Sequence, residues 1–213
     1  MAVRHGLTAA LLVAVVACGG QEGEVIAEEN FEPPSHRWSV ADTAGATYEY
    51  ADQGYRIVAA EPNQVVYSLL PTDPSFAALS VEADMTLRTG SGGPDTWGVA
   101  CLSGRRLGYL FTVLADGRYV ITKARDLSTA KIDLVKEGKS DVILGPDRTN
   151  RVRGDCFGSA TGPTRLALFV NGEQMTEAED AQGLERFDAI GFVVYTRKGG
   201  TEVLFDDLLV TEH

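Results

Sequence analysis

The residues of this chain that come closest to a catalytic pattern are the two carboxylates of the run from Glu82 to Thr86. Residues two apart on a strand share a face, so Glu82 and Asp84 would lie side by side. A retaining glycosidase uses two carboxylates about 5–5.5 Å apart. The alternation of these acids with Val81, Ala83 and Met85 favours the simpler interpretation, in which both acids face solvent from a half-buried strand.

A second acidic pair, Asp206-Asp207, comes near the C-terminal end of the sequence, and Glu28-Glu29 comes near its start. Carboxylates together with backbone oxygens are the ligands that Ca²⁺ prefers. No Asp-rich loop of fixed spacing accompanies them, so the sequence predicts no metal site. Asp206 and Asp207 remain weak calcium candidates, against acids that bond the backbone or pair with arginine.

The thiols Cys101 and Cys156 have two possible roles. A catalytic thiol needs a histidine base, and His36 and His213 are the only histidines after residue 17. Two cysteines in an oxidising compartment most often pair. We therefore expect a Cys101–Cys156 disulfide, which in the chain-entropy model contributes about 4 kcal/mol of stability.

Other catalytic and cofactor motifs are missing from the sequence. Residues 90–93 are glycine-rich but are followed by no Lys-Ser/Thr pair, so they form no phosphate loop. No Gly-x-Ser-x-Gly nucleophile elbow occurs, and two histidines with committed cysteines make no zinc set. We expect no catalytic residue, no cofactor and no enzyme activity.

The N-terminal residues carry an export signal. Arg4 and His5 precede an uncharged apolar run over residues 7–17, which is too short to cross a bilayer of about 30 Å and fits a secretory signal peptide. The run ends in Val15-Val16-Ala17-Cys18, which resembles the lipobox of bacterial lipoproteins. The resemblance implies cleavage after residue 17 and lipid, palmitate included, on Cys18. An ordinary signal peptide with an unrelated cysteine is the alternative.

The composition restricts the classes of partner and the cellular compartment that we expect for this protein. The formal net charge of −11 argues against nucleic acid and against adsorption to anionic lipid. With the lipid, we expect a membrane-anchored protein of the cell envelope that faces the periplasm or the exterior. Residues 18–24 would form a short lipidated tether and residues 25–213 one domain.

The elements of that domain are expected to be strands, because turn signals interrupt apolar–polar alternation at short spacing. Asp116-Gly117 and Asn171-Gly172 predict two-residue hairpin turns. The first would pair Leu114 with Tyr119, and the second would pair Phe169 with Gln174 and Leu168 with Met175. A third hairpin is expected at Gly199-Gly200, and residues 82–87 and 97–102 are expected to form further strands.

The segments 97–101, 109–123, 150–158, 166–172 and 205–210, together with Asn30-Phe31 and Trp38, resemble the laminin-G-like, concanavalin A-like jelly-roll domains of exported bacterial lipoproteins and receptor ectodomains. The resemblance covers residues 25–211. It implies an all-β, antiparallel, two-sheet jelly-roll sandwich. Better-known relatives bind glycans or proteins and some distant ones hydrolyse glycans, but the final glutamate of the glycosidase motif is replaced here by Thr86.

The expected ligand site depends on which face of the sheet is open. A four-residue loop over 103–106 would pair Leu102 with Leu107 and set Tyr109 above Gly98 and Ala100. Arg151 and Arg153 lie opposite to Cys156 on their own strand. If both cysteines mark the core face of one sheet, Tyr109, Arg151 and Arg153 form an open ligand site. If the disulfide instead links two sheets, Tyr109 belongs to the core.

These observations favour a non-catalytic binding domain, for glycans or for an envelope protein. A glycan-processing hydrolase and a purely structural envelope protein are the alternatives. Aromatic and arginine side chains gathered on one open sheet face would favour binding, whereas two convergent acids in a deep cleft would favour hydrolysis.

Overall fold

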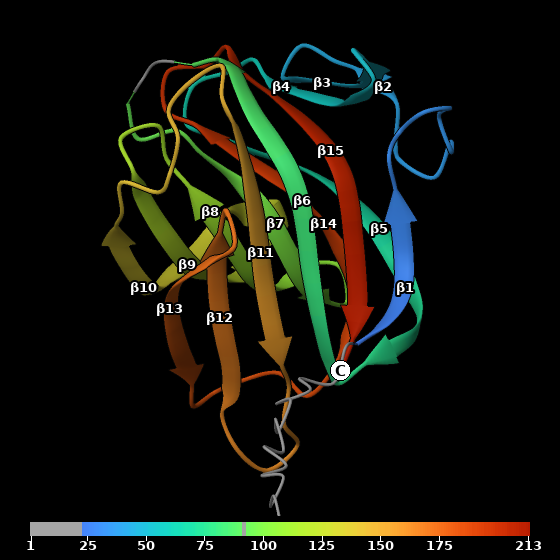
Figure 1. The fold of residues 1–213 in the computed structure, drawn as a ribbon, viewed down its shortest axis with the longest axis vertical. Coiled ribbons are helices and arrows are strands. Elements are labelled where there is room, and N and C mark those ends of the chain that lie inside the picture. Colours follow the sequence, from blue (N-terminus) through green and yellow to red (C-terminus); the bar gives the residue numbers. More distant parts are fainter. Residues whose placement is uncertain (1–22, 91–92) are drawn as a thin grey trace, which may run out of the picture.

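The computed structural model of the chain describes residues 23–90 and 93–213. The predicted signal peptide, Cys18 and most of the tether lie outside these residues. The described part folds into two antiparallel β-sheets packed face to face (Figure 1). It holds no helix that is long and apolar enough to span a membrane.

The larger sheet, sheet A, has nine strands, and in Figure 1 it faces the viewer. Along the sheet the strands follow the order β13-β12-β11-β6-β15-β4-β3-β2, and β1 pairs with β15. Their bounds are β1 Glu24–Glu29, β2 Ala41–Asp42, β3 Ala46–Ala51, β4 Gly54–Ala59, β6 Ala78–Thr89, β11 Thr149–Phe157, β12 Thr164–Val170, β13 Glu173–Asp180 and β15 Thr201–Glu212.

The smaller sheet, sheet B, has six strands in the order β10-β9-β8-β7-β14-β5. Their bounds are β5 Gln64–Phe76, β7 Thr96–Ser103, β8 Leu107–Val113, β9 Arg118–Asp126, β10 Lys131–Lys139 and β14 Phe187–Thr196, with one 3₁₀ turn at Leu127–Thr129. Every strand pair is antiparallel, as the resemblance implied.

The core lies between the sheets, and strands such as β4 and β6 direct their most buried side chains toward it, whereas β7, β8 and most of β14 are buried on both faces. On β6, Val81, Ala83 and Met85 are completely buried, while Glu82 and Asp84 remain partly exposed. The predicted orientation of these two acids is therefore correct. Stacked rings fill one end of the core, with 4.6 Å between the centroids of Trp38 and Phe192 and 4.3 Å between those of Phe192 and Phe205.

The β7–β8 pair differs from expectation by one residue. Ser103 pairs with Leu107 and Cys101 with Tyr109, so the loop has three residues and not four. Gly104 and Arg105 adopt positive φ angles of 62° and 61°, which lets the chain reverse in this shorter loop. Because side chains alternate along a strand, the shift of one residue moves Tyr109 to the face of Cys101.

The two glycine hairpins also correct the sequence prediction. At Asp116-Gly117, the Leu114 amide donates a hydrogen bond to the Arg118 carbonyl. The loop between these two residues has three residues and ends in Gly117, which has a φ of +86°. Val113, and not Leu114, is therefore the partner of Tyr119. Such a loop is the common alternative to the two-residue turn.

The Asn171-Gly172 turn has the predicted two residues, and the pair of Phe169 with Gln174 is confirmed. A β-bulge follows directly, so Leu168 pairs with Thr176. The predicted pair with Met175 is wrong, because the bulge inserts one extra residue on β13.

The third predicted hairpin is not a hairpin. The chain passes Gly199-Gly200 from β14 in sheet B to β15 in sheet A, so the two strands belong to different sheets. The buried Asp95 stabilises this crossing, because its carboxylate accepts hydrogen bonds from the Arg197 amide at 2.8 Å and the Thr201 hydroxyl at 2.9 Å.

The predicted disulfide between Cys101 and Cys156 is present. Cys101 lies on β7 and Cys156 on β11, so the bond joins sheet B to sheet A through the core. The assumption that both cysteines share one sheet is wrong, and the alternative, a bond between sheets, is correct.

Candidate functional site

Tyr109 does not lie on an open face. Its side chain is completely buried between the sheets, and its hydroxyl donates to Asp180 Oδ2 at 2.8 Å. Burial raises the pKa of the Tyr109 hydroxyl well above its usual value. Lys123 Nζ lies 2.5 Å from the same carboxylate oxygen. Tyr109 is thus part of a buried polar contact between sheets, and its predicted role in an open ligand site is wrong.

Arg151 lies on the outer face of sheet A, where it neutralises the two acids considered for catalysis. Its Nε lies 3.1 Å from Glu82 Oε1, and its terminal nitrogen lies 3.2 Å from Asp84 Oδ1. The same nitrogen donates to the Asp207 carbonyl at 2.7 Å. Carboxylates paired with one arginine on a sheet surface are not the convergent pair that glycoside hydrolysis needs.

Asp206 and Asp207 occupy an irregular point in β15, where the register with β6 shifts and Asp207 has a φ of +45°. Burial raises the pKa of Asp206, and the nearby charges of Asp207 and Asp84 add to this effect. Within residues 23–90 and 93–213, no group of three or more His, Cys, Asp or Glu side chains is arranged to hold a metal ion.

Arg153, the other arginine predicted on an open face, stacks on a phenylalanine. Its guanidinium carbon lies 3.8 Å from the ring centroid of Phe169, its direct partner across β11 and β12. Its Nε forms an ion pair of 3.1 Å with Asp155 Oδ1. Aromatic contact and ion pair together hold the guanidinium flat against the sheet.

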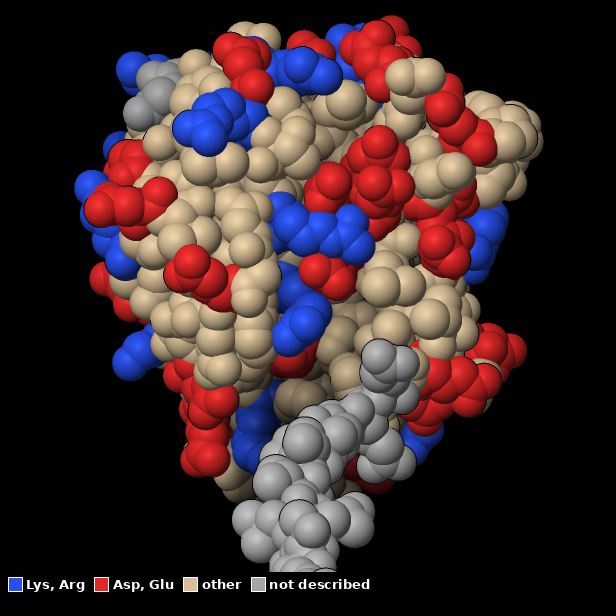
Figure 2. All heavy atoms as spheres, in the orientation of Figure 1, with Lys and Arg blue, Asp and Glu red and all other residues tan. Residues whose placement is uncertain are grey.

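A second stack of the same kind lies further along the same two strands. Phe157 and Arg165 are direct partners, with the guanidinium carbon 5.4 Å from the ring centroid. Between the two stacks Asp155 faces the small Ala167. We call the outer surface formed by Arg153, Phe157, Arg165 and Phe169 the arginine–phenylalanine face. Figure 2 shows basic groups along the middle of this side of the molecule and acidic groups on both flanks.

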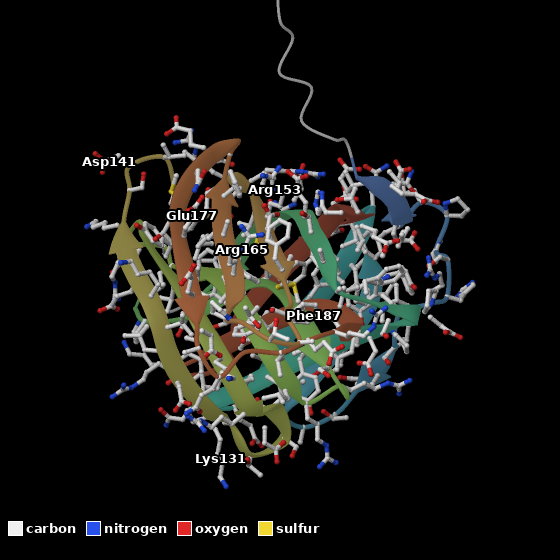
Figure 3. All side chains as sticks on the ribbon, turned by 90° about the horizontal axis from the view of Figure 1, so that it is seen from below. Lys131, Asp141, Arg153, Arg165, Glu177 and Phe187 are labelled. Carbon is white, nitrogen blue, oxygen red and sulfur yellow. A yellow bond between two sulfur atoms is a disulfide. The ribbon has the colours of Figure 1, made fainter. Side chains whose placement is uncertain are left out.

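A hollow of about 420 Å³ opens on this face over β11, β12 and β13. Phe157 of β11, Arg165 and Ala167 of β12, and Glu177 and Glu179 of β13 line it, so Arg165 lies between Phe157 and Glu179. Glu177 pairs with Ala167 and Glu179 with Arg165 across β12 and β13. In Figure 3, Arg153, Arg165 and Glu177 come from these strands, whereas Phe187 lies in the interior.

The outer face of sheet B carries a different cavity. A groove of about 270 Å³ is lined by residues of all six strands, mostly aliphatic, with the hydroxyls of Thr96, Thr112, Thr122 and Tyr195 and the amide of Asn63. It contains no carboxylate and no arginine or lysine. This groove is therefore neutral, in contrast to the hollow of sheet A.

Ser80, Asp155 and His213 lie together at the edge of the arginine–phenylalanine face but do not form a catalytic triad. Ser80 Oγ donates to Asp155 Oδ1 at 2.7 Å and lies 2.6 Å from His213 Nε2. An ionised carboxylate only accepts hydrogen bonds, so the Ser80 hydroxyl donates its hydrogen bond to Asp155. The nitrogen of His213 must then be the donor in its bond with Ser80. A nucleophilic serine needs the opposite direction, with the histidine as acceptor.

Sequence reasoning placed Arg153 on an open surface but missed Phe157, Arg165 and Phe169. The alternation Arg151, Arg153, Asp155, Phe157 already puts these residues on one face of β11. Which residues of β12 lie beside them depends on the β11–β12 register, and no short turn joins those strands to fix it.

Comparison with known proteins defines the class of fold. No family model and no curated protein sequence matches this chain. Among solved structures, it is similar to a galectin-like protein of unknown function from Bacillus subtilis, with a TM-score of 0.65, 12% identity, and 90% of this chain and 97% of that chain covered.

Two solved carbohydrate-binding domains are also similar. The carbohydrate-binding module CBM66 from Bacillus subtilis has a TM-score of 0.59 and 15% identity, over 83% of this chain and 96% of that one. The metal-free Emp46p carbohydrate recognition domain has a TM-score of 0.56 and 10% identity, over 84% and 90%. The chain thus has the galectin-like jelly-roll sandwich fold that these domains share.

Proposed function

We propose that this protein is a lipid-anchored, non-catalytic glycan-binding domain of the cell envelope. The observation that carries the proposal is the hollow of sheet A, in which an aromatic ring, a guanidinium group and two carboxylates surround an alanine. An aromatic ring accepts the apolar face of a sugar, and planar polar groups bond its hydroxyls. The aromatic and arginine side chains gathered on an open sheet face are the arrangement expected of a binding domain.

The proposal is non-catalytic because the acids and the serine that were considered for catalysis are engaged in other contacts. Glu82 and Asp84 share Arg151, and the Ser80 hydroxyl donates its hydrogen bond to Asp155. The similarity to solved carbohydrate-binding domains supports the same function through the fold alone.

Binding can be tested on a glycan array with the domain from residue 23 onward and two matched variants. Phe157→Ala removes the ring of the hollow, and Tyr195→Ala removes the aromatic ring of the groove in sheet B. We expect Phe157→Ala to weaken binding about tenfold, the effect of roughly 1.4 kcal/mol, while Tyr195→Ala binds as the wild type does. Absence of any glycan signal, or loss of binding only with Tyr195→Ala, contradicts the proposal.

Anchoring is supported by the apolar run that ends at Cys18. Because β1 begins at Glu24, whose partner is Glu212, a tether from Cys18 would join the domain at the end where β15 finishes. We expect full-length wild type to enter the detergent phase and Cys18→Ala to stay in the aqueous phase. Aqueous partitioning of both proteins would exclude the lipid anchor.

A further inference from the structure

The charged side chains that line the hollow in sheet A indicate which kind of sugar it binds. This inference rests on the proposed function, because it names the sugar that the same hollow takes. We propose that the hollow binds a uronic acid residue, whose carboxylate pairs with Arg165 and whose hydroxyl groups donate to Glu177 and Glu179.

Arg165 is the cation of the hollow that lacks a protein carboxylate. On the same face of sheet A, Arg151 pairs with Glu82 and Asp84, and Arg153 pairs with Asp155. Within the described residues, no acid lies within ion-pair distance of Arg165, although Glu179 is its direct partner across β12 and β13. The guanidinium lies toward Phe157 instead. Its donors match the two oxygens of a carboxylate.

The β13 side of the hollow, beside Arg165, accepts hydrogen-bond donors. Glu177 and Glu179 are two residues apart on β13, so both project from the outer face of sheet A. Glu177 accepts one bond of 2.7 Å from Gln174 and keeps further acceptor positions, and both side chains are exposed. Ionised carboxylates only accept hydrogen bonds, so a ligand that bonds these two side chains must bring hydroxyl or ammonium groups to them.

A uronic acid places both kinds of group correctly. Its carboxylate on C5 lies across one pyranose ring from the hydroxyls on C2 and C3, and the ring has an apolar face for Phe157. Ala167 is small enough to let the ring approach the sheet. The hollow of about 420 Å³ falls within the range of about 300–1,000 Å³ that is usual for small-ligand sites.

Alternative ligands fit the charges less well. A neutral hexose leaves Arg165 without an anion. A group of several close negative charges meets repulsion from Glu177 and Glu179 on β13. One carboxylate with hydroxyls on the same ring can contact Arg165 and both glutamates, and so the charge pattern favours a uronate.

The test measures binding of oligosaccharides of galacturonate, glucuronate and mannuronate, each beside its carboxyl-reduced neutral form. The protein variants are Arg165→Ala, Arg165→Lys and, as a control for the loss of one exposed arginine outside the hollow, Arg148→Ala. We expect at least one uronate to bind about tenfold or more tightly than its reduced form, an advantage that Arg165→Ala abolishes. Arg165→Lys should keep only part of this affinity advantage, because lysine lacks the planar guanidinium group that pairs with both oxygens of a carboxylate. Arg148→Ala should retain the full preference for the uronate.

The outcomes separate this inference from the proposed function. Equal affinity for acidic and reduced forms overturns the uronate, and so does an unaffected Arg165→Ala variant. If the reduced forms bind and Phe157→Ala weakens them, glycan binding at the hollow still stands. If no glycan of either kind binds to a folded protein, both proposals fail. Tighter binding of sulfated, carboxylate-free oligosaccharides would assign Arg165 to a different anion and likewise overturn the uronate.

Discussion

Tyr109 lies directly across the β7–β8 pair from Cys101, and both side chains point into the core between the two sheets. The disulfide of Cys101 with Cys156 and the hydrogen bond of Tyr109 with Asp180 therefore join the sheets from neighbouring strands. Substitutions can measure how much each of these two contacts adds to the free energy of unfolding.

Removal of the Tyr109 ring should make the protein less stable without altering its ligand site. We expect Tyr109→Ala to lower the free energy of unfolding by about 3–5 kcal/mol, since it leaves a large cavity in the core. Tyr109→Phe keeps the ring and should cost about 1.5–3 kcal/mol, the range for the loss of a hydrogen bond to a charged group. Urea denaturation measures both. Glycan binding lost with Tyr109→Phe at full stability would restore Tyr109 to the ligand site.

The disulfide closes a loop with a sequence separation of 55 residues between its two cysteines. In the chain-entropy model, such a loop stabilises the fold by about 4 kcal/mol. We expect the double variant Cys101→Ser, Cys156→Ser to lose about that much stability in denaturant titrations. Thiol labelling of unreduced, denatured wild type should find neither cysteine free. Labelling of both residues in protein taken from the envelope would contradict the prediction.

Acid should weaken the contact around Asp180 in a predictable range of pH. Burial raises the pKa of this carboxyl, but hydrogen bonds from Lys123, Tyr109 and the Gln182 amide outweigh burial and hold the pKa below its usual value. A lowered pKa stabilises the fold above the unfolded value of about 3.9, and this stability is lost as the pH falls through the folded pKa. Asp180→Asn should therefore be less stable than wild type at pH 7, with a difference that shrinks below about pH 4. A constant difference from pH 7 to pH 2 would refute this assignment.

Asp206 should behave in the opposite way. Its pKa is raised by burial and by its acidic neighbours, so its charged form destabilises the fold at neutral pH. Asp206→Asn keeps the side-chain oxygen that accepts the Asp207 amide at 2.8 Å. We expect the variant to be more stable than wild type by about 0.5 kcal/mol at pH 7, and equally stable at a pH where the wild-type carboxyl is protonated. If millimolar Ca²⁺ stabilises wild type but not the variant, Asp206 is instead a calcium ligand.

The exposed acids of β6 offer a check on catalysis. Glu82→Gln weakens the ion pair with Arg151, and Asp84→Asn weakens a second one. Both side chains are partly exposed, so we expect each change to alter the free energy of unfolding by about 1 kcal/mol or less. Neither should change turnover of any glycan, because the proposed domain has none. A glycan hydrolysis that survives purification and disappears in either variant would establish an enzyme.

Part of the candidate site could be predicted from the sequence. The alternation around Arg153 placed its side chain on an outer face, and period-two patterning correctly oriented Glu82 and Asp84. The stacks with Phe157 and Phe169 could not be derived, because β11 and β12 are joined by the irregular residues 158–163 and not by a short turn. Without a turn of known type, the cross-strand neighbours of a residue are undetermined.

The residue pattern by itself determined that the chain is all-β with antiparallel strands, where most of its turns lie, and that its two cysteines pair; the two-sheet sandwich came from the family resemblance. These features depend on local alternation, on glycine at positive φ and on a small count of thiols. Only the tertiary structure decided which strands share a sheet and which face of each strand is buried. One residue more or less in the loops after Ser103 and Leu114 inverts a whole strand, and the choice between such loops depends on how both sheets pack around a common core.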